Sequence, residues 1–309
     1  MKGPLFYSKI LLFGEYGIIK DSKGLSIPYN FYNGALKMDI NPSEEALASN
    51  LNLIEFVEFL KGLDSDLVVF DFEKLSADVQ KGMYFDSSIP QGYGVGSSGA
   101  LVAAIYDKYA QEKITVLENL TREKLLKLKA VFSEMEAFFH GKSSGLDPLN
   151  SYLSLPILIN SKDNIEATGI PAQQNSGEGA VFLLDSGMTG ETAPMVRIFM
   201  ENMKHEGFRS MIKDQFIKHT DACVEDFLKG DIKSLFSNTK QLSKVVLNHF
   251  KPMIPKQFHE LWKKGIETNE YYLKLCGSGG GGYILGFTRD FKKAQQALSA
   301  YKLEVVYNF

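Results

Sequence analysis

The chain has 309 residues, of which 44% are hydrophobic and 23% are charged, and its 34 basic and 37 acidic residues give a net charge of −3. Its length favours two domains with a substantial core, and its near-neutral charge argues against a surface for nucleic acid or anionic membranes. Neither a signal peptide nor an apolar run approaching the ~20 residues of a membrane helix is recognised. Cys223 and Cys276 match no metal-ligand spacing, so a reducing compartment, the cytoplasm by default, is expected.

The first predicted element is a strand over residues 5–13, an apolar, β-like segment interrupted by Lys9. A lysine at such a place is either an edge-strand side chain that reaches solvent or a functional group held in a site. Further strands are expected within residues 25–40 and at 67–72 and 83–85.

A helix is predicted over residues 43–61, with Ser43 as its N-cap. Apolar residues recur along it at helical spacing, and we assign this stripe to core packing rather than to chemistry. The stripe consists of Leu47, Leu51, Ile54, Val57 and Leu60.

Residues 90–100 read Pro-Gln-Gly-Tyr-Gly-Val-Gly-Ser-Ser-Gly-Ala and lead into an apolar segment that is predicted to be a helix. The alternating glycines keep side chains away from the backbone, so several N–H groups can converge on one anion, and the helix N-terminus adds positive potential. Ser97 and Ser98 lie where hydroxyls can cap the helix, contact phosphate or bind a metal. An ordinary glycine-rich turn and a dinucleotide-binding G-x-G-x-x-G loop are the alternatives.

A second long helix with one buried face is predicted before residue 141. A capping box at Thr115 and Glu118 would begin it, and its buried face is formed by Leu125, Leu128, Phe132, Met135 and Phe139. Glu136 lies about a quarter turn from that face, where a solvated glutamate is the plain alternative. Gly141 can end the helix, and the small residues after it bring Asp147 in on closely packed backbone.

A polar stretch at residues 160–178 is predicted to separate two domains, residues 1–170 and 171–309. A strand at residues 181–187 is followed by a largely helical region. The last part is predicted to contain strands around residues 272–275 and 283–287, a helix at 292–300 and a strand at 303–307. Four consecutive glycines at 279–282 would be costly in a plain hairpin, which favours close approach of the backbone to a ligand.

Several of these segments together resemble the motifs of the galactokinase, homoserine kinase, mevalonate kinase and phosphomevalonate kinase (GHMP kinase) superfamily. Residues 9–16 are similar to K-x-I-L-x-G-E-H of mevalonate kinases, with Tyr16 in place of histidine. Residues 90–100 resemble P-x-x-x-G-L-G-S-S-A-A, with Gly99 where alanine is preferred. Residues 140–147 resemble H-G-x-[PS]-S-G-x-D, and residues 274–282 resemble K-x-T-G-A-G-G-G-G.

The resemblance implies an α+β fold of two-layer α/β type, the GHMP kinase fold, with an N-terminal ribosomal-protein-S5-like α/β domain that binds ATP and a C-terminal ferredoxin-like domain. It implies phosphoryl transfer from ATP, with Mg²⁺, to a small-molecule alcohol. Asp147 is then the catalytic base and Lys9 its partner, while Ser98 and Glu136 bind the metal. The nucleotide-binding residues are Gly92, Gly94, Val95, Gly96, Ser97, Ser98, Gly279 and Gly280. The substrate-binding residues are Glu15, Tyr16 and Thr192, with a helix N-cap as the equal alternative for Thr192.

Within the superfamily the chain looks most like a mevalonate kinase, which makes mevalonate 5-phosphate for isoprenoid precursor biosynthesis. Tyr16 is also common at this position in phosphomevalonate kinases, so that enzyme or another GHMP kinase is the alternative. A catalytically silent sensor of nucleotide or metabolite is the alternative from another class. The sequence leaves a homodimer open.

Overall fold

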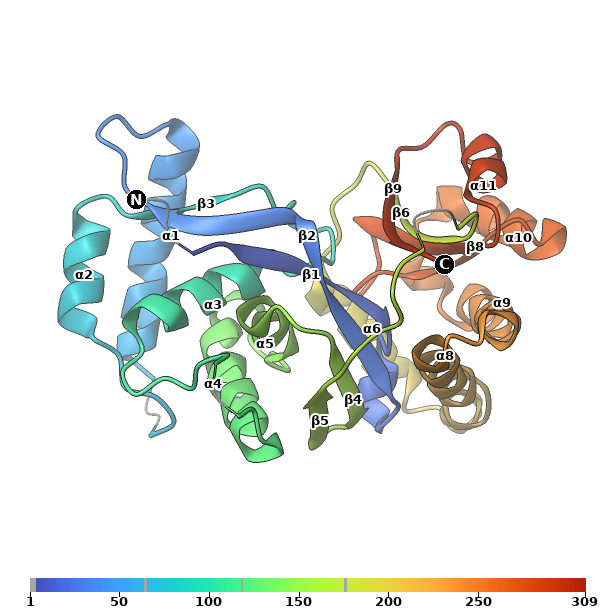
Figure 1. Cartoon of the computed structure of the whole chain (residues 1–309), viewed down its shortest axis with the longest axis horizontal. Helices are drawn as coiled ribbons and strands as arrows, with labels where there is room; N and C mark the ends of the chain where they lie inside the picture. Colours follow the sequence, from blue (N-terminus) through green and yellow to red (C-terminus); the bar gives the residue numbers. More distant parts are fainter. Residues whose placement is uncertain (1–3, 64–65, 118, 175–176) are drawn as a thin grey trace. The chain divides into compact units, whose positions relative to one another are not determined.

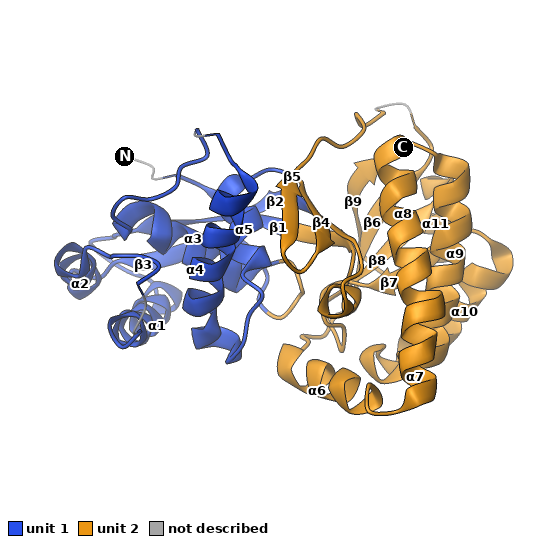
Figure 2. Cartoon of the chain, turned by 90° about the horizontal axis from the view of Figure 1, so that it is seen from below, with its two compact units in different colours: residues 1–9, 27–91, 96–155 blue, residues 10–26, 92–95, 156–309 orange. Residues whose placement is uncertain are grey.

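The structure is a computed structural model that describes residues 4–63, 66–117, 119–174 and 177–309 (Figure 1). Its chain divides into two compact units, coloured separately in Figure 2, and each unit combines segments distant in sequence. Unit 1 contains the described residues up to 9, together with 27–91 and 96–155, and unit 2 contains 10–26, 92–95 and 156–309. The domain limits 1–170 and 171–309 stay a prediction.

Unit 1 combines antiparallel strands with helices that pack on one another. Its helices are α1 (Glu44–Lys61), α2 (Phe72–Gln80), α3 (Ser97–Tyr109), α4 (Arg122–His140) and α5 (Leu146–Leu153). Strand β2 (Gly24–Lys37) pairs antiparallel with β3 (Tyr84–Ser87), with Gly34 opposite Ser87 and Lys37 opposite Tyr84. Helices α3, α4 and α5 pack against one another. α3 is apolar on nearly every side because it is the central helix of this core, with Ala100, Val102, Ala103, Ala104 and Ile105 all buried.

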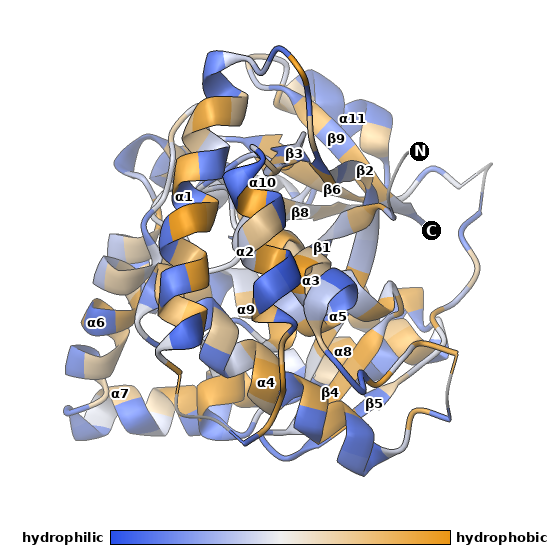
Figure 3. Ribbon diagram, turned by 90° about the vertical axis from the view of Figure 1, so that its left-hand side faces the viewer, coloured by the Kyte–Doolittle hydropathy of each residue, from blue (hydrophilic) through white to orange (hydrophobic). Residues whose placement is uncertain are grey.

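Helix α1 begins as predicted, because the Ser43 Oγ accepts a hydrogen bond from the Ala46 amide at 3.2 Å. The apolar stripe predicted for α1 is wrong in part: Leu47, Leu51 and Ile54 are 52%, 63% and 42% exposed, whereas Val57 and Leu60 are buried. Figure 3 shows apolar and polar bands alternating along α1. The buried face is turned toward Phe56 because its ring packs on those of Phe138 and Phe139 in α4, with centroids 5.2 and 5.5 Å away.

Two further sequence predictions in unit 1 are wrong. Residues 67–72 form no strand among the described residues. Phe70 makes a single β-bridge to Ala110, and α2 begins soon after because Asp71 caps it, accepting from the Lys74 amide. Helix α4 is capped by Thr121 rather than by Thr115, and Glu118 lies outside the described residues.

Unit 2 is built on a four-stranded antiparallel sheet in the order β7-β8-β6-β9. These strands are β6 (Ala180–Asp185), β7 (Tyr272–Leu275), β8 (Tyr283–Thr288) and β9 (Leu303–Asn308). Its helices are α6 (Thr192–Asn202), α7 (Glu206–Met211), α8 (Lys218–Lys229), α9 (Ile232–His249), α10 (His259–Thr268) and α11 (Phe291–Ala297). Helix α9 packs against β7 and β8, and a π-helical turn, Ile212–Ile217, joins α7 to α8.

The second sheet has the order β1-β2-β4-β5, with β3 paired to β2. Strand β1 (Phe6–Phe13) is the predicted first strand, and β4 (Ile157–Ser161) pairs with β2 and with β5 (Asn164–Ala167). Strands β1 and β2 each contribute residues to both units. Within the described part of the chain, no helix has the length and apolar character needed to cross a bilayer.

Candidate active site

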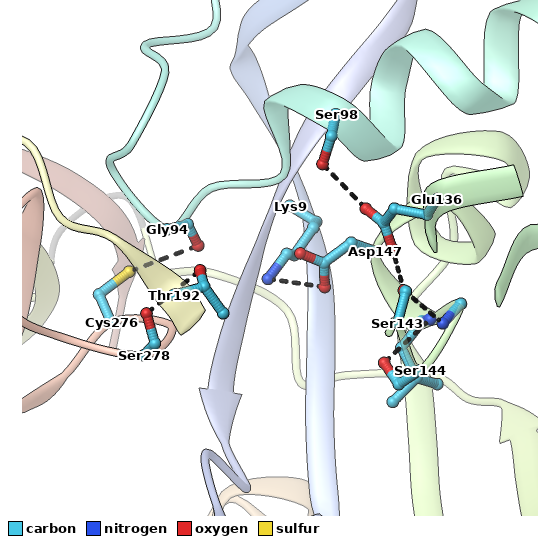
Figure 4. Close-up of polar contacts among 12 residues, drawn as sticks. Lys9, Gly94, Ser98, Glu136, Ser143, Ser144, Asp147, Thr192, Cys276 and Ser278 are labelled. Atoms are coloured by element: carbon cyan, nitrogen blue, oxygen red, sulfur yellow. Dashed lines mark hydrogen bonds and ion pairs between the residues drawn. The ribbon is translucent and has the colours of Figure 1, made fainter. Parts of the chain in front are cut away.

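Lys9 and Asp147, distant in sequence, form an ion pair within unit 1, with the Lys9 Nζ 2.9 Å from the Asp147 Oδ1 (Figure 4). The Lys9 side chain is 4% exposed and that of Asp147 is 39% exposed. The residue before Lys9 ties this part of β1 to β2, because the buried Ser8 hydroxyl donates to the Tyr29 carbonyl of β2 at 2.7 Å. The pair therefore has a rigid, buried ammonium group and a carboxylate that a ligand can reach.

The start of α5 determines where Asp147 lies. Its N-cap, Gly145, has a φ of 70°, and a Cβ there would come within 2.1 Å of the Lys129 carbonyl oxygen in α4. Only glycine allows this conformation and this close approach without strain. The small residues before Asp147 thus bring it in on tightly packed backbone, as the sequence predicted.

Glu136 is a buried carboxylate beside this pair, in α4, with 3% of its surface exposed. It accepts a hydrogen bond from the Ser98 hydroxyl at 2.9 Å and another from the Ser143 hydroxyl (Figure 4). Burial, reinforced by the charge of Asp147, raises the pKa of Glu136 to about 7, against the opposing effects of the two hydroxyls and Lys9. The solvated glutamate considered from the sequence is therefore wrong.

The N-terminus of α3 lies beside Lys9. Gly96 is its N-cap, with a φ of 82°, and among the described residues no side chain caps this end. The first amide groups of a helix have no partner within it, so those of α3 remain suited to an anion. A Cβ on Gly96 would lie 3.0 Å from the Lys9 Cγ, which shows how closely the lysine stem packs on this turn. Ser97 and Ser98 follow in the first turn.

His140 and Ser143 belong to this cluster, although we assigned neither of them a role from the sequence. The His140 Nε2 lies 3.2 Å from the Ser98 Oγ instead of pairing with a carbonyl. Burial lowers the pKa of His140, with the charge of Asp147 opposing that shift. The sequence did contain a pointer to both residues, because His140 and Ser143 lie in the same motif as Asp147, at residues 140–147.

The remaining predicted site residues lie in unit 2, where residues 92–95 pack on the glycine-rich residues 277–282. A Cβ on Gly282 would lie 2.5 Å from the Tyr93 Cα, and a Cβ on Gly277 would lie 3.0 Å from the Gly94 Cα. A Cβ on Gly94 would come 2.7 Å from the Cys276 carbonyl oxygen. The glycines here permit backbone to approach backbone, and Val95 is fully buried.

The residues predicted to bind substrate are also in unit 2, where each has a polar partner. Glu15 is buried and pairs with Lys274, whereas Tyr16 donates to the Ser278 carbonyl. Thr192 is the first residue of α6, whose N-cap is Glu191, so the N-cap alternative is wrong; its Oγ1 accepts from the Ser278 Oγ at 3.3 Å (Figure 4). Substrate contact by Glu15, Tyr16 and Thr192 stays a prediction.

Two more of the glycines predicted to contact nucleotide, Gly279 and Gly280, lie between β7 and β8. Gly279 is buried, and the Gly280 amide donates to the Met253 carbonyl at 2.6 Å. Their contact with nucleotide stays a prediction.

No group of three or more His, Cys, Asp or Glu side chains gathers at a metal-binding spacing within the described residues. A cation at this cluster would need serine, water or ligand oxygens to complete its coordination. Mg²⁺ commonly binds through one or two carboxylates plus phosphate oxygens and waters, and Glu136 with Ser98 offers such a partial set.

Comparisons with known proteins found one family model and a set of similar folds. Residues 66–154 match the model of the GHMP kinases N terminal domain. No curated protein matches the sequence significantly.

Solved structures with a similar fold include three small-molecule kinases. Mevalonate kinase of L. major in complex with R-mevalonate superposes with a TM-score of 0.59 at 18% identity, over 97% of this chain and 93% of that one. Phosphomevalonate kinase of Streptococcus pneumoniae in complex with phosphomevalonate and AMPPNP has a TM-score of 0.62 and a sequence identity of 12%, and the match covers 98% of both chains. Lactococcus lactis galactokinase complexed with galactose has a TM-score of 0.61 and a sequence identity of 12%, and the match covers 98% of this chain and 92% of that one.

At these identities the likeness shows the fold, and it confirms the predicted fold class, helices with two antiparallel sheets in the GHMP kinase arrangement. The match over residues 66–154 covers α3, α4 and α5, the helices that carry Ser98, Glu136 and Asp147. Residues 66–154 are thus similar to the N-terminal domain of GHMP kinases, and the chain as a whole has the fold of the kinases compared above.

Proposed function

We propose that this protein is an ATP-dependent kinase of a small-molecule alcohol, and that mevalonate is its acceptor, giving mevalonate 5-phosphate. The observation that carries the proposal is the pair in unit 1: a buried Lys9 ammonium 2.9 Å from the Oδ1 of Asp147, whose side chain is 39% exposed. A base must be reachable by the hydroxyl it deprotonates, and this carboxylate is.

Asp147 accepts the proton of the attacking hydroxyl in this proposal. The new bond forms between the acceptor oxygen and the γ-phosphorus of ATP, the bond from that phosphorus to the β–γ bridging oxygen breaks, and ADP leaves with the electron pair. Lys9, held beside Asp147, stabilises the negative charge that develops on the attacking oxygen. Because the transferred phosphoryl group also carries dispersed negative charge, fixed donors and cations supply most of the catalysis.

The triphosphate of ATP is held by backbone amides at the uncapped start of α3 and in the glycine-rich segment before it. A phosphomevalonate kinase of similar fold was solved in complex with the ATP analogue AMPPNP, which supports ATP as the phosphoryl donor. The proposed nucleotide-binding residues are Gly92, Gly94, Val95, Gly96, Ser97, Ser98, Gly279 and Gly280.

Ser98 and Glu136 fit a magnesium ion. Both offer hard oxygen atoms, and the Glu136 carboxylate is almost completely buried beside Asp147, an environment that disfavours its charge. A cation at these oxygens would compensate that charge. When bound, Mg²⁺ would neutralise part of the phosphate charge.

Mevalonate is favoured as the acceptor because the motifs at residues 9–16 and 140–147 look most like those of mevalonate kinases. Phosphomevalonate kinase is the rival because of Tyr16. The TM-scores of 0.59 for a mevalonate kinase and 0.62 for a phosphomevalonate kinase do not separate the two.

A coupled assay of ADP release tests the proposal. Purified protein receives ATP and Mg²⁺ with mevalonate, mevalonate 5-phosphate, homoserine or galactose, and we expect the highest kcat/KM with mevalonate. A preference for another acceptor would replace the substrate assignment and keep the kinase. Stabilisation of the protein by ATP without ADP release from any acceptor would instead support a silent sensor.

A further inference from the structure

We propose that Glu15 and Tyr16 are positioning residues that hold the second glycine loop, defined as residues 277–282, in its nucleotide-binding shape. The inference rests on the proposed function, in which this loop contacts ATP. Both residues and the loop belong to unit 2. Glu15 contacts Lys274 before the loop begins, and Tyr16 contacts Ser278 within it.

The first contact is the buried ion pair between Glu15 and Lys274. The Lys274 Nζ lies 2.6 Å from the Glu15 Oε1 and also donates to the Leu275 carbonyl at 2.7 Å. Both side chains are nearly inaccessible, at 4% and 5% exposure. Strand β7 is thereby tied to the turn after β1 just before the loop begins.

The second contact is made by the next residue. The Tyr16 hydroxyl donates to the Ser278 carbonyl at 2.7 Å, and the Tyr16 ring packs on Phe199 and Phe250, with centroids 4.7 and 5.7 Å away. Tyr16 also has a φ of 60° and a ψ of −38°, a strained conformation for a residue with a side chain. Such strain persists where surrounding contacts over-determine it, and here the aromatic packing and the hydrogen bond do so.

The loop needs this support because five of its six residues are glycine. A glycine-rich chain loses more conformational entropy on ordering than any other. Ser278 is its one residue with a side chain, and both of its polar oxygens are held, the carbonyl by Tyr16 and the hydroxyl through Thr192. Tyr16 is thus placed to order the loop.

The variant Tyr16→Phe removes the hydroxyl and keeps the ring. Tyr307→Phe is a matched control, because Tyr307 is also buried in unit 2 and its hydroxyl donates to the Pro171 carbonyl at 2.8 Å. In titrations of AMPPNP with Mg²⁺ into the full chain, we expect Tyr16→Phe to weaken binding by about two- to tenfold, the value of one hydrogen bond, and Tyr307→Phe to leave it unchanged.

Amide hydrogen exchange measures how well the backbone of the second glycine loop is ordered, and the measurement does not depend on enzyme activity. Peptides that cover residues 277–282 should exchange faster in Tyr16→Phe than in the wild type or in Tyr307→Phe, with the nucleotide absent. Equal exchange in the three proteins, or equal loss of AMPPNP affinity in both variants, overturns the positioning role. If the wild type binds no nucleotide, the proposed function fails, and the exchange comparison still decides whether Tyr16 orders the loop.

Discussion

The two units each contain a buried lysine on a β-strand, and the two lysines differ in what surrounds their carboxylate partners. Lys9 in β1 and Lys274 in β7 both have side chains that are 4% exposed. Asp147, the partner of Lys9, is 39% exposed, whereas Glu15, the partner of Lys274, is 5% exposed. A nearly identical charge pair is therefore open in unit 1 and closed in unit 2.

The accessibility of the carboxylate determines which of the two pairs can react with a substrate. A fully enclosed pair lacks a path for a substrate atom, and breaking it leaves an unpaired charge in the interior. An open carboxylate held beside a buried ammonium can exchange protons with a ligand and stays screened by water. We therefore expect changes in the unit 1 pair to alter turnover and changes in the unit 2 pair to alter stability.

Asp147→Asn should have the largest effect. The amide keeps the shape of the carboxylate and cannot accept a proton, so kcat should fall by about 10²- to 10⁴-fold, as for loss of a general base. The midpoint of thermal unfolding should fall less than in Lys274→Met, because the amide oxygen can still accept a hydrogen bond from the buried Lys9 ammonium and because position 147 is 39% exposed to water. Steady-state ADP release and a thermal scan of the same preparation measure both quantities.

The control for this change is Asp290→Asn, which removes the carboxylate of a surface ion pair with Lys293. It should leave turnover at the wild-type value. Near-normal kcat in Asp147→Asn would refute the base role.

Lys274→Met should act on stability. The change leaves the Glu15 carboxylate buried without its partner, and losses of this kind cost about 3–5 kcal/mol. Urea denaturation should show a lower midpoint with an unchanged slope. Lys293→Met, on an ion pair with side-chain exposures of 68% and 31%, is the matched control and should cost less than about 1 kcal/mol. If Lys274→Met and the wild type had the same urea midpoint, the enclosed pair of unit 2 would not contribute to stability as we expect.

The sequence predicted most of the unit 1 site because its residues lie in local patterns with a chemical reason. Gly96 and the serines after it predict the start of a helix, and α3 does begin there. The small residues before Asp147 predict the close packing that Gly145 makes against α4. The sequence does not predict that Ser143 donates to Glu136, since that contact depends on how the end of α4 meets the loop after it.

The same limit explains the errors in the fold. Along α1, the spacing of Leu47, Leu51 and Ile54 fits a buried stripe. The face around Phe56 is buried instead, because α1 packs against β3, α2 and the aromatic rings of α4. In unit 2, the closed environment of Glu15 is invisible in sequence because Lys274 comes from a distant strand. Local patterns fix elements and caps, whereas long-range packing decides which of several suitable faces is buried.

The pH dependence of stability sharpens the contrast between the two buried glutamates. Glu15 has a lysine partner, whereas the hydrogen bonds to Glu136 come from neutral hydroxyls, and burial and Asp147 raise the Glu136 pKa to about 7. The folded protein then holds a proton here that the unfolded chain, with its ordinary pKa of about 4.5, releases. The contribution of Glu136 to stability is present below about pH 4.5 and is lost as the pH rises through about 7.

Urea unfolding of wild type and Glu136→Gln in EDTA measures this contribution, because the amide cannot titrate. The stability of the wild type relative to Glu136→Gln should fall by on the order of 3 kcal/mol between pH 4.5 and 8. A constant difference across that range would contradict the raised pKa.

Gly99→Ala should have the smallest effect on turnover. It tests whether the packing of α3 on α5 holds Asp147 in position. The family prefers alanine at this position, yet a Cβ on Gly99 would lie 2.8 Å from the Asp147 carbonyl carbon and 2.8 Å from the Pro148 nitrogen. Both are backbone atoms, so the start of α5 must move, and we expect kcat to fall by about tenfold because small displacements of a reacting group are costly.

The matched control is Gly207→Ala in α7, where nothing lies within 4 Å of an added Cβ. Alanine is favoured over glycine in a helix by about 1 kcal/mol, so Gly207→Ala should keep full turnover and gain some stability. The same intrinsic gain is available at Gly99, so a lower kcat there would come from the displaced Asp147 rather than from the helix. A Gly99→Ala enzyme with wild-type turnover would show that α5 can shift without moving its carboxylate, and would weaken the case that close packing of α3 on α5 sets the geometry of the open pair.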